Sequence, residues 1–275
     1  MNEKFDEVLF LGTGTSTGVP IPGCPCQICH SKDPKNTRFR SSIFIKSKNN
    51  LNFIIDTGPD LRSQLLQNNI TTLDFAIITH CHADHVGGID DLRPFTFLPE
   101  RKTVPVFCHP YHYDEIKNKF AYIFKRKEIF NKNNPYVGGG LPSLDLYPIT
   151  ELHKMFPIKD LSWELAPHGN TKTMILFYKS LCYLIDCHQV PAEILSKITN
   201  YSTLIIDCVK KGRHPSHLGT EQCAEILNQV EPKEAYLTHL GHDLEHTQLK
   251  NEFIKKVGSH VEVAYDGLSF NLKTR

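Results

Sequence analysis

The sequence has almost no net charge and no long apolar stretch. Its 31 Lys and Arg residues and 30 Asp and Glu residues leave a formal charge of +1, so no overall field attracts it to nucleic acid or an anionic membrane. No apolar run approaches the ~20 residues of a membrane-spanning helix. The N-terminal letters MNEKFDEVLF lack the basic-then-apolar pattern of a secretory signal. These absences predict a cytoplasmic protein without a membrane partner.

The chain also lacks a Ser/Gly-rich linker or a low-complexity tract that would divide its 275 residues. A chain of this length buries roughly 75% of its unfolded surface and can form a core without disulfide or metal staples. We therefore expect one α/β domain over residues 1–275. Helices are predicted at Leu61–Gln67, Pro191–Ile198 and Glu221–Val230. Strands are predicted at Glu7–Leu11, Ser42–Lys46, Leu51–Ile55, Phe75–Thr79, Ala235–Thr238 and Val261–Ala264.

Three apolar runs end in aspartate: NFIID at Asp56, YLID at Asp186 and LIID at Asp207. The first two are followed by a predicted helix. Because α/β folds gather function at the carboxyl ends of their strands, the repeated pattern indicates two similar α/β halves with polar groups at strand ends. Apolar strands that simply meet polar loops would give the same pattern, and both interpretations stay open.

Histidine and cysteine, by contrast, are abundant, with 15 and 9 residues. The densest group is THCHADH, residues 79–85, directly after a predicted strand. Imidazole and carboxylate are good ligands for Zn²⁺ and related divalent ions. His80 and His82 alternate, so both can point to one side, whereas Asp84 and His85 lie at the turn into the next helix. The segment therefore predicts ligands for two metals.

The pattern His80-x-His82-x-Asp84-His85 resembles the signature of the metallo-β-lactamase-fold hydrolases. That resemblance implies an αββα sandwich with a two-metal site along one edge. The family's remaining ligands follow downstream in the order His, Asp, His. The matching positions are His168 in APHGN, Asp186 in YLIDC and His239 in YLTHLGH. By resemblance, His80, His82 and His168 bind one metal, Asp84, His85 and His239 bind the other, and Asp186 bridges them.

Two adjacent cations suit hydrolysis, because they lower the pKa of a shared water and offset charge in the transition state. Zn, Mn and Fe all accept such ligands. Asp84 is a candidate to take the nucleophile's proton as well as to bind metal. Among the hydrolases that this chain resembles, phosphodiesterases place a histidine that does not bind metal after a later strand. His217 fits that position better than His214. Such a histidine contacts the phosphate or protonates the leaving oxygen; a surface histidine in a basic loop is the alternative.

The letters CPCQICH, residues 24–30, contain three cysteines within six residues. Disulfides are uncommon in the cytoplasm, and attachment of c-type haem to CQICH would need export. A structural zinc needs four ligands, and His30 or His242 could complete the three thiolates. His242 is the better candidate, because adjacent residues rarely reach one metal comfortably. Its position three residues after His239 would tie the cysteine loop to the rim of the active site.

The cysteine loop narrows the resemblance from the whole family of hydrolases to one subfamily. Together with Gly12-Thr-Gly14, Gly18-Val-Pro20, Arg40-Ser-Ser42 and His239-x-x-His242, it resembles the phosphoribosyl 1,2-cyclic phosphate phosphodiesterases. By this resemblance a structural zinc, held in an N-terminal loop at about residues 24–29, is bound by Cys24, Cys26, Cys29 and His242. The implied function is hydrolysis of a small cyclic or nucleotide-like phosphodiester, which makes a small phosphorylated molecule the expected partner.

Two rival functions share the ligand set. A ribonuclease-Z-like enzyme that processes tRNA 3′ ends does not require the cysteine loop, and it uses a Gly-rich arm for which Asn133–Leu141 is short. Another ester or thioester hydrolase on the same scaffold is the second rival. The segment Lys117–Lys132 interleaves basic and aromatic residues, which fits a lid, a nucleic-acid patch or a solvated face. The oligomeric state is left open, a homodimer included.

Overall fold

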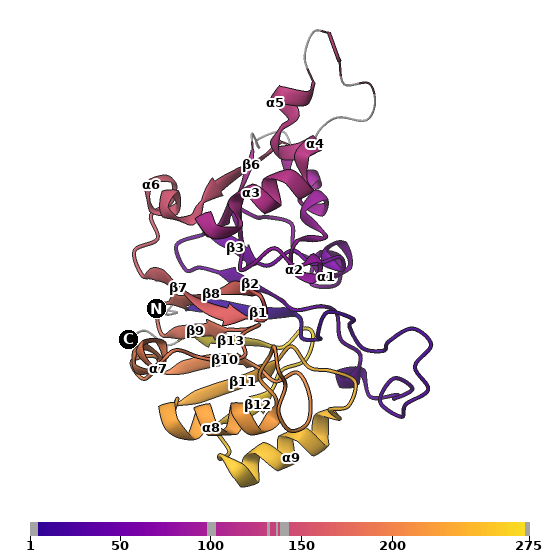
Figure 1. The fold of residues 1–275 in the computed structure, drawn as a ribbon, viewed down its shortest axis with the longest axis vertical. Helices are drawn as coiled ribbons and strands as arrows, with labels where there is room; N and C mark the ends of the chain where they lie inside the picture. Colours follow the sequence, from indigo (N-terminus) through magenta and orange to yellow (C-terminus); the bar gives the residue numbers. More distant parts are fainter. Residues whose placement is uncertain (1–4, 98–102, 131–132, 136, 138–142, 273–275) are drawn as a thin grey trace. The chain divides into compact units, whose positions relative to one another are not determined.

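The computed structural model describes residues 5–97, 103–130, 133–135, 137 and 143–272 (Figure 1). Lys132 and much of Asn133–Leu141 lie outside the described residues, as do the first four letters of the N-terminal segment. The chain forms two compact units. Unit 1 comprises Met1–Ile43 and Asp160–Arg275, and unit 2 comprises Phe44–Lys159.

Unit 1 contains a six-stranded mixed sheet in the order β12-β11-β10-β9-β8-β7. Strands β9 to β12 run parallel, whereas β7, β8 and β9 pair antiparallel. Their bounds are β7 (Leu161–His168), β8 (Thr171–Tyr178), β9 (Leu181–Leu184), β10 (Thr203–Asp207), β11 (Glu234–Thr238) and β12 (Val261–Val263). Near the chain ends, β1 (Asp6–Gly12) pairs antiparallel with β13 (Ser269–Leu272). The parallel strands bring the carboxyl ends of β9, β10 and β11 to one edge of the sheet.

Three helices lie beside this sheet, as Figure 1 shows for α8 and α9. They are α7 (Ala192–Ile198), α8 (Thr220–Val230) and α9 (His246–Lys256). Each contributes apolar residues to one core shared with the strands: Ile194, Ile198, Cys223, Leu227, Leu249 and Phe253. Burial of these side chains holds the helices against the sheet, at roughly 1.5–3 kcal/mol for each large one. The core therefore fixes the strand ends from which site residues project.

Unit 2 is built on strands in the order β2-β3-β4-β5-β6, of which β3 to β6 run parallel. The strands are β2 (Ser42–Lys46), in which the boundary between the units falls, β3 (Asn52–Ile55), β4 (Phe75–Ile78), β5 (Val104–Cys108) and β6 (Leu144–Pro148). The helices are α1 (Leu61–Gln67), α2 (Ala83–Val86), α3 (Pro110–Lys119), α4 (Ala121–Phe124), α5 (Arg126–Ile129) and α6 (Leu152–Met155). Short 3₁₀ helices cover Pro34–Asn36 in unit 1, and Ile89–Thr96 and Ile149–Glu151 in unit 2.

The predicted α/β class is confirmed, and each predicted helix and strand is found with its ends shifted by at most one residue. The basic, aromatic stretch forms the end of α3 and the short helices α4 and α5 rather than one continuous element. Its tertiary packing explains this, because α3 and α4 both pack on β6. Among the described residues, no helix combines the length and apolar character needed to cross a bilayer.

Candidate metal and active-site residues

In unit 2, the predicted metal ligands follow β4 in one loop and the short helix α2. The ring of His80 lies 4.6 Å from that of His82 and 4.2 Å from that of His85, measured between centroids. His80 and His85 are buried, and His82 is exposed. Asp84 Oδ2 lies 3.2 Å from His85 Nε2. Four potential ligands of divalent ions are thus gathered in six residues.

Asp56 orients one of these ligands. Its Oδ2 lies 2.8 Å from His85 Nδ1, and its Oδ1 accepts a hydrogen bond from the Thr79 backbone N–H at 2.8 Å. Burial raises the pKa of Asp56, and the contacts with His85 and Thr79 act in the opposite direction. When His85 is neutral, a proton on Nδ1 leaves a lone pair on Nε2, which is how metal-ligating histidines are commonly held by carboxylates.

The distances around His85 fit metal binding. When two ligand atoms bind one Zn²⁺ with bond lengths of roughly 2.0–2.2 Å, they lie about 2.9–3.4 Å from each other. This range holds for ligand–metal–ligand angles between a right angle and the tetrahedral angle. The 3.2 Å between His85 Nε2 and Asp84 Oδ2 falls in this range. Two lone-pair donors that face one another at this distance are stabilised by a cation between them. The donor chemistry of unit 2 therefore suits a divalent ion.

Unit 1 gathers a second group of potential ligands, three of them buried near the ends of β9, β10 and β11 and the fourth half-buried in the loop after β10. The group consists of Asp186, Asp207, His217 and His239, and one ligand atom of each lies within 4.8 Å of the others. Asp186 Oδ1 lies 3.2 Å from His239 Nε2 and 2.9 Å from His217 Nδ1. Because these distances also match ligands around one ion, this group is chemically suited to a metal as well.

His168, the last residue of β7, belongs to the same region of unit 1. Its ring lies 4.8 Å from that of His217, and its Nδ1 lies 3.0 Å from the carbonyl oxygen of Ser216. A carbonyl only accepts hydrogen bonds, so His168 carries its proton on Nδ1 and presents Nε2 as a lone-pair donor. The structure thus places His168 beside His217 in unit 1, whereas His80, His82, Asp84 and His85 lie in unit 2.

His217 sits between two carboxylates. Its Nδ1 lies 3.6 Å from Asp207 Oδ2 in addition to its contact with Asp186. Burial by itself lowers the pKa of His217, but hydrogen bonds with the two carboxylates outweigh it and raise the pKa to about 10. His214, the other histidine of this loop, lies 5.2 Å away between ring centroids. The sequence assigned no role to Asp207, although the LIID strand end was the signal that could have found it.

The backbone is constrained at three of these positions. Asp56, Asp186 and His239 have φ angles of 66°, 52° and 56°, in the left-handed region. Few residues other than glycine adopt this conformation, although Asn, Asp and His do so more often than most. Each of the three comes after a strand that pairs parallel with at least one neighbour, namely β3, β9 or β11. Strained backbone at strand ends, observed with buried polar side chains, is typical of functional sites.

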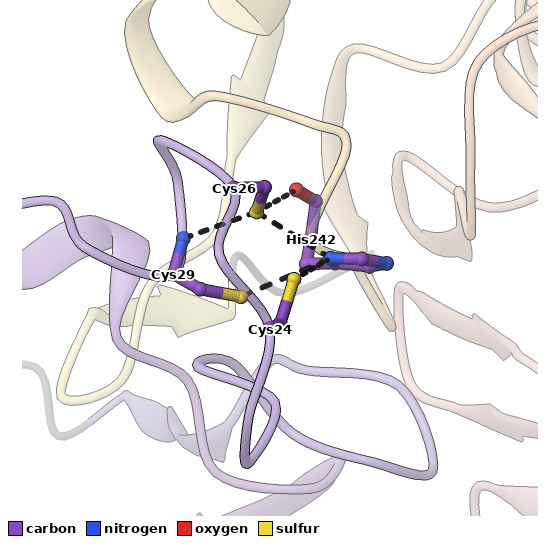
Figure 2. Close-up of side chains that lie close together, drawn as sticks. All are labelled: Cys24, Cys26, Cys29 and His242. Atoms are coloured by element: carbon purple, nitrogen blue, oxygen red, sulfur yellow. Dashed lines mark hydrogen bonds between the residues drawn. The ribbon is translucent and has the colours of Figure 1, made fainter.

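The cysteine loop of unit 1 meets His242 (Figure 2). His242 Nδ1 lies 3.3 Å from Cys24 Sγ, 3.5 Å from Cys26 Sγ and 3.8 Å from Cys29 Sγ. Sulfur and nitrogen ligands of one tetrahedral Zn²⁺ lie about 3.5 Å apart, so the four atoms fit such an ion. The Cys29 N–H donates to Cys26 Sγ and, with His242, lowers the pKa of the Cys26 thiol to about 6, which favours the thiolate that binds metal.

The alternative ligand His30 is turned to another partner. Its Nδ1 lies 3.1 Å from the Cys26 carbonyl oxygen, and its side chain is exposed. The remaining six cysteines are buried: Cys81, Cys108, Cys182, Cys187, Cys208 and Cys223.

A short backbone segment links the two groups of unit 1. The Leu240 N–H donates to the Thr13 carbonyl at 2.8 Å, and the Gly241 N–H donates to the Val209 carbonyl at 3.0 Å. A Cβ at Gly241 would lie 2.5 Å from that carbonyl oxygen, so only glycine fits this close approach. The segment therefore holds His239 in the Asp186 group and His242 in the cysteine group.

A family model described as "Beta-lactamase superfamily domain" matches residues 51–240. The chain belongs to the beta-lactamase superfamily. This membership confirms the predicted metallo-β-lactamase fold.

Three known proteins are similar to this chain. An octanoyltransferase of Porphyromonas gingivalis is 34% identical over 263 residues, which are 94% of this chain; the chain spans only 50% of that protein's length. The crystal structure of a diphosphatase from the PhnP family is 26% identical, with a TM-score of 0.81 and 98% of both chains covered. The Zn²⁺-bound PqqB of Methylobacterium extorquens is 16% identical, with a TM-score of 0.73 and 97% and 100% of the chains covered, and shows the fold alone. The superfamily match and the likeness to a PhnP-family diphosphatase support a metal-dependent hydrolase domain.

Proposed function

We propose that this chain is a dinuclear-metal phosphodiesterase that hydrolyses a small cyclic or nucleotide-like phosphodiester, with phosphoribosyl 1,2-cyclic phosphate as one candidate. The observation that carries the proposal is the Cys₃His group of unit 1, because the cysteine loop and His242 are among the features that narrowed the sequence resemblance to the phosphodiesterases. The likeness to a PhnP-family diphosphatase supports a phosphorylated substrate. The nine free cysteines agree with a reducing, cytoplasmic setting.

The proposed ligands are the seven residues that the sequence resemblance implies. They bind two divalent ions, Zn, Mn or Fe, through nitrogen and carboxylate donors, the set that these ions accept. We assign His80, His82 and His168 to one ion, Asp84, His85 and His239 to the other, and Asp186 to both. A separate structural zinc is assigned to Cys24, Cys26, Cys29 and His242.

When bound, two divalent ions supply a water of lowered pKa and positive charge beside the phosphoryl oxygens. The chain's own groups orient the ligands and transfer the protons. Asp56 and the Ser216 carbonyl fix the tautomers of His85 and His168. Asp84, 13% exposed, takes the proton of the attacking water. His217 lies between Asp186 and Asp207, which raise its pKa and keep it protonated at neutral pH, and it gives a proton to the departing oxygen.

A second candidate is hydrolysis of an octanoyl thioester. The observation that favours it is the 34% identity to half of a protein called octanoyltransferase. One fold supports several ester chemistries, because two cations polarise a thioester carbonyl as they do a phosphoryl group. The bond cleaved in this candidate is a carbonyl–sulfur bond, so it predicts that no phosphodiester bond is needed for turnover.

A substrate panel separates these candidates. We expect the zinc- or manganese-loaded protein to cleave phosphoribosyl 1,2-cyclic phosphate or bis-p-nitrophenyl phosphate at least about 100-fold faster than an octanoyl thioester or a pre-tRNA, measured as kcat/KM. A preference for the thioester would establish the second candidate instead. Cleavage of pre-tRNA with a steep salt dependence would favour the ribonuclease-Z-like function. Turnover of none of the four compounds by the loaded protein would contradict the proposal.

A further inference from the structure

One face of α3 contacts the loop that carries His80 and His82. His112, Glu115 and Lys119 are spaced by three and four residues, which places them on one side of a helix. The ring of His112, which is buried, lies 6.5 Å from that of His80, edge to face. Lys119 Nζ donates a hydrogen bond to the carbonyl oxygen of Cys81 at 2.7 Å. The helix thus contacts the loop at the His80 ring and at the Cys81 carbonyl.

The Cys81 carbonyl needs such a donor. Residues 80–82 belong neither to β4 nor to α2, so regular secondary structure does not pair this carbonyl, and Cys81 is only 3% exposed. A buried carbonyl without a partner costs on the order of a hydrogen bond. The hydrogen bond therefore fixes the plane of the peptide bond that joins Cys81 to His82.

Glu115 supports this contact and balances its charge. Its Oε1 lies 2.8 Å from Lys119 Nζ, one helical turn earlier. The two side chains are 43% and 53% exposed, so the pair itself contributes little to stability. Its consequence is local, because the carboxylate neutralises an ammonium group that would otherwise repel divalent ions at the neighbouring histidines.

We propose that Lys119 is a positioning residue for metal binding: by holding the Cys81 carbonyl, it sets the direction of the His80 and His82 rings. The inference rests on the proposed function, because it takes these histidines as metal ligands. It gives part of the Lys117–Lys132 stretch a role other than lid, nucleic-acid patch or solvated face. Groups that orient ligands typically change metal affinity or activity 10–100-fold when they are removed.

The test compares Lys119→Met with Lys119→Arg and Lys117→Met in the full chain. Lys117 lies on the same helix, but its Nζ pairs with exposed Glu128 at 3.5 Å, so its variant is the matched control. Two quantities are measured: amide hydrogen exchange over residues 80–87 in metal-free protein, and the dissociation constant for Mn²⁺. Manganese is the probe because thiolate ligands at the Cys₃His group prefer softer ions.

We expect Lys119→Met to speed exchange several-fold and to weaken Mn²⁺ binding about tenfold. Lys119→Arg keeps a cationic donor, so its exchange rate and Mn²⁺ affinity should stay near those of the wild type. Lys117→Met should match the wild type in both measurements. Equal values for Lys119→Met and Lys117→Met in both measurements would overturn the proposal, as would faster exchange with unchanged Mn²⁺ affinity. Faster exchange and weaker Mn²⁺ binding in a protein that hydrolyses no phosphodiester would uphold the role of Lys119 and reject the proposed function.

Discussion

Replacement of Asp84 by asparagine is expected to lower kcat on bis-p-nitrophenyl phosphate by about 10³-fold while the fold stays intact. The change removes a carboxylate that faces His85 Nε2 at 3.2 Å and with it the proposed proton acceptor, a loss typically worth 10²–10⁴-fold. Asp84 lies in the short helix α2 and is 13% exposed, so little packing is lost. Steady-state kinetics, with thermal unfolding on the same samples, measure both effects.

The matched control is Asp90→Asn. Asp90 is also an acidic residue of this region, but its carboxylate pairs with Arg93 at 3.1 Å and is 35% exposed. We expect this variant to keep wild-type kcat within about twofold, because the Asp90 carboxylate pairs with Arg93 and is not among the proposed metal ligands. Full activity of Asp84→Asn would show that the catalytic assignment is wrong.

His217→Gln separates proton donation from metal binding in the same assay. If His217 protonates the leaving oxygen, its loss should slow esters with a poor, alkoxide leaving group by about 10²-fold or more and leave p-nitrophenyl esters nearly unchanged, because p-nitrophenolate departs without a proton. An equal loss on both ester types would point instead to a ligand or binding role beside Asp186, from which His217 Nδ1 is 2.9 Å away.

Replacement of Cys24 by serine is expected to release one zinc per chain and to lower the free energy of unfolding by on the order of 3 kcal/mol, because metal affinity at a structural site contributes directly to folding. For a chain of this size that corresponds to a fall in Tm of roughly 6–12 °C. Activity should fall by about tenfold as well, since His242 and His239 are held by the same backbone segment. Metal analysis and calorimetry measure the first two effects.

His30→Gln is the control for the cysteine loop. His30 adjoins the three thiols, but its Nδ1 contacts the Cys26 carbonyl, so this variant should keep its zinc. His242→Gln should behave like Cys24→Ser, because His242 Nδ1 is 3.3 Å from Cys24 Sγ. Zinc loss from His30→Gln together with retention in His242→Gln would reverse the choice of the fourth ligand.

Local patterns predicted those parts of the structure that depend on local chemistry. The apolar runs ending at Asp56, Asp186 and Asp207 marked strand ends, and the periodic segments marked α1, α7 and α8. The 3.3 Å approach of His242 to Cys24, 218 residues apart, was predictable because four zinc ligands must be found and His242 lies beside another candidate ligand.

Contacts between distant elements could not be predicted in this way. Nothing in the letters around Lys119 indicates a hydrogen bond to the Cys81 carbonyl 38 residues earlier, because that contact depends on how α3 packs against the loop that follows β4. The pairing of His217 with Asp207 likewise depends on the loop between β10 and α8 folding back on the strand end. The left-handed backbone at Asp56, Asp186 and His239 also follows from tertiary constraint rather than from local preference.

Metal reconstitution tests the central claim most directly. Protein stripped by a chelator is titrated with Zn²⁺ or Mn²⁺, and bound metal and phosphodiesterase activity are measured on the same samples. The account predicts about three zinc ions per chain at saturation, with activity appearing only as the two ions beyond the Cys₃His zinc are bound. Saturation at a single zinc per chain, or full activity in the stripped protein, would contradict it.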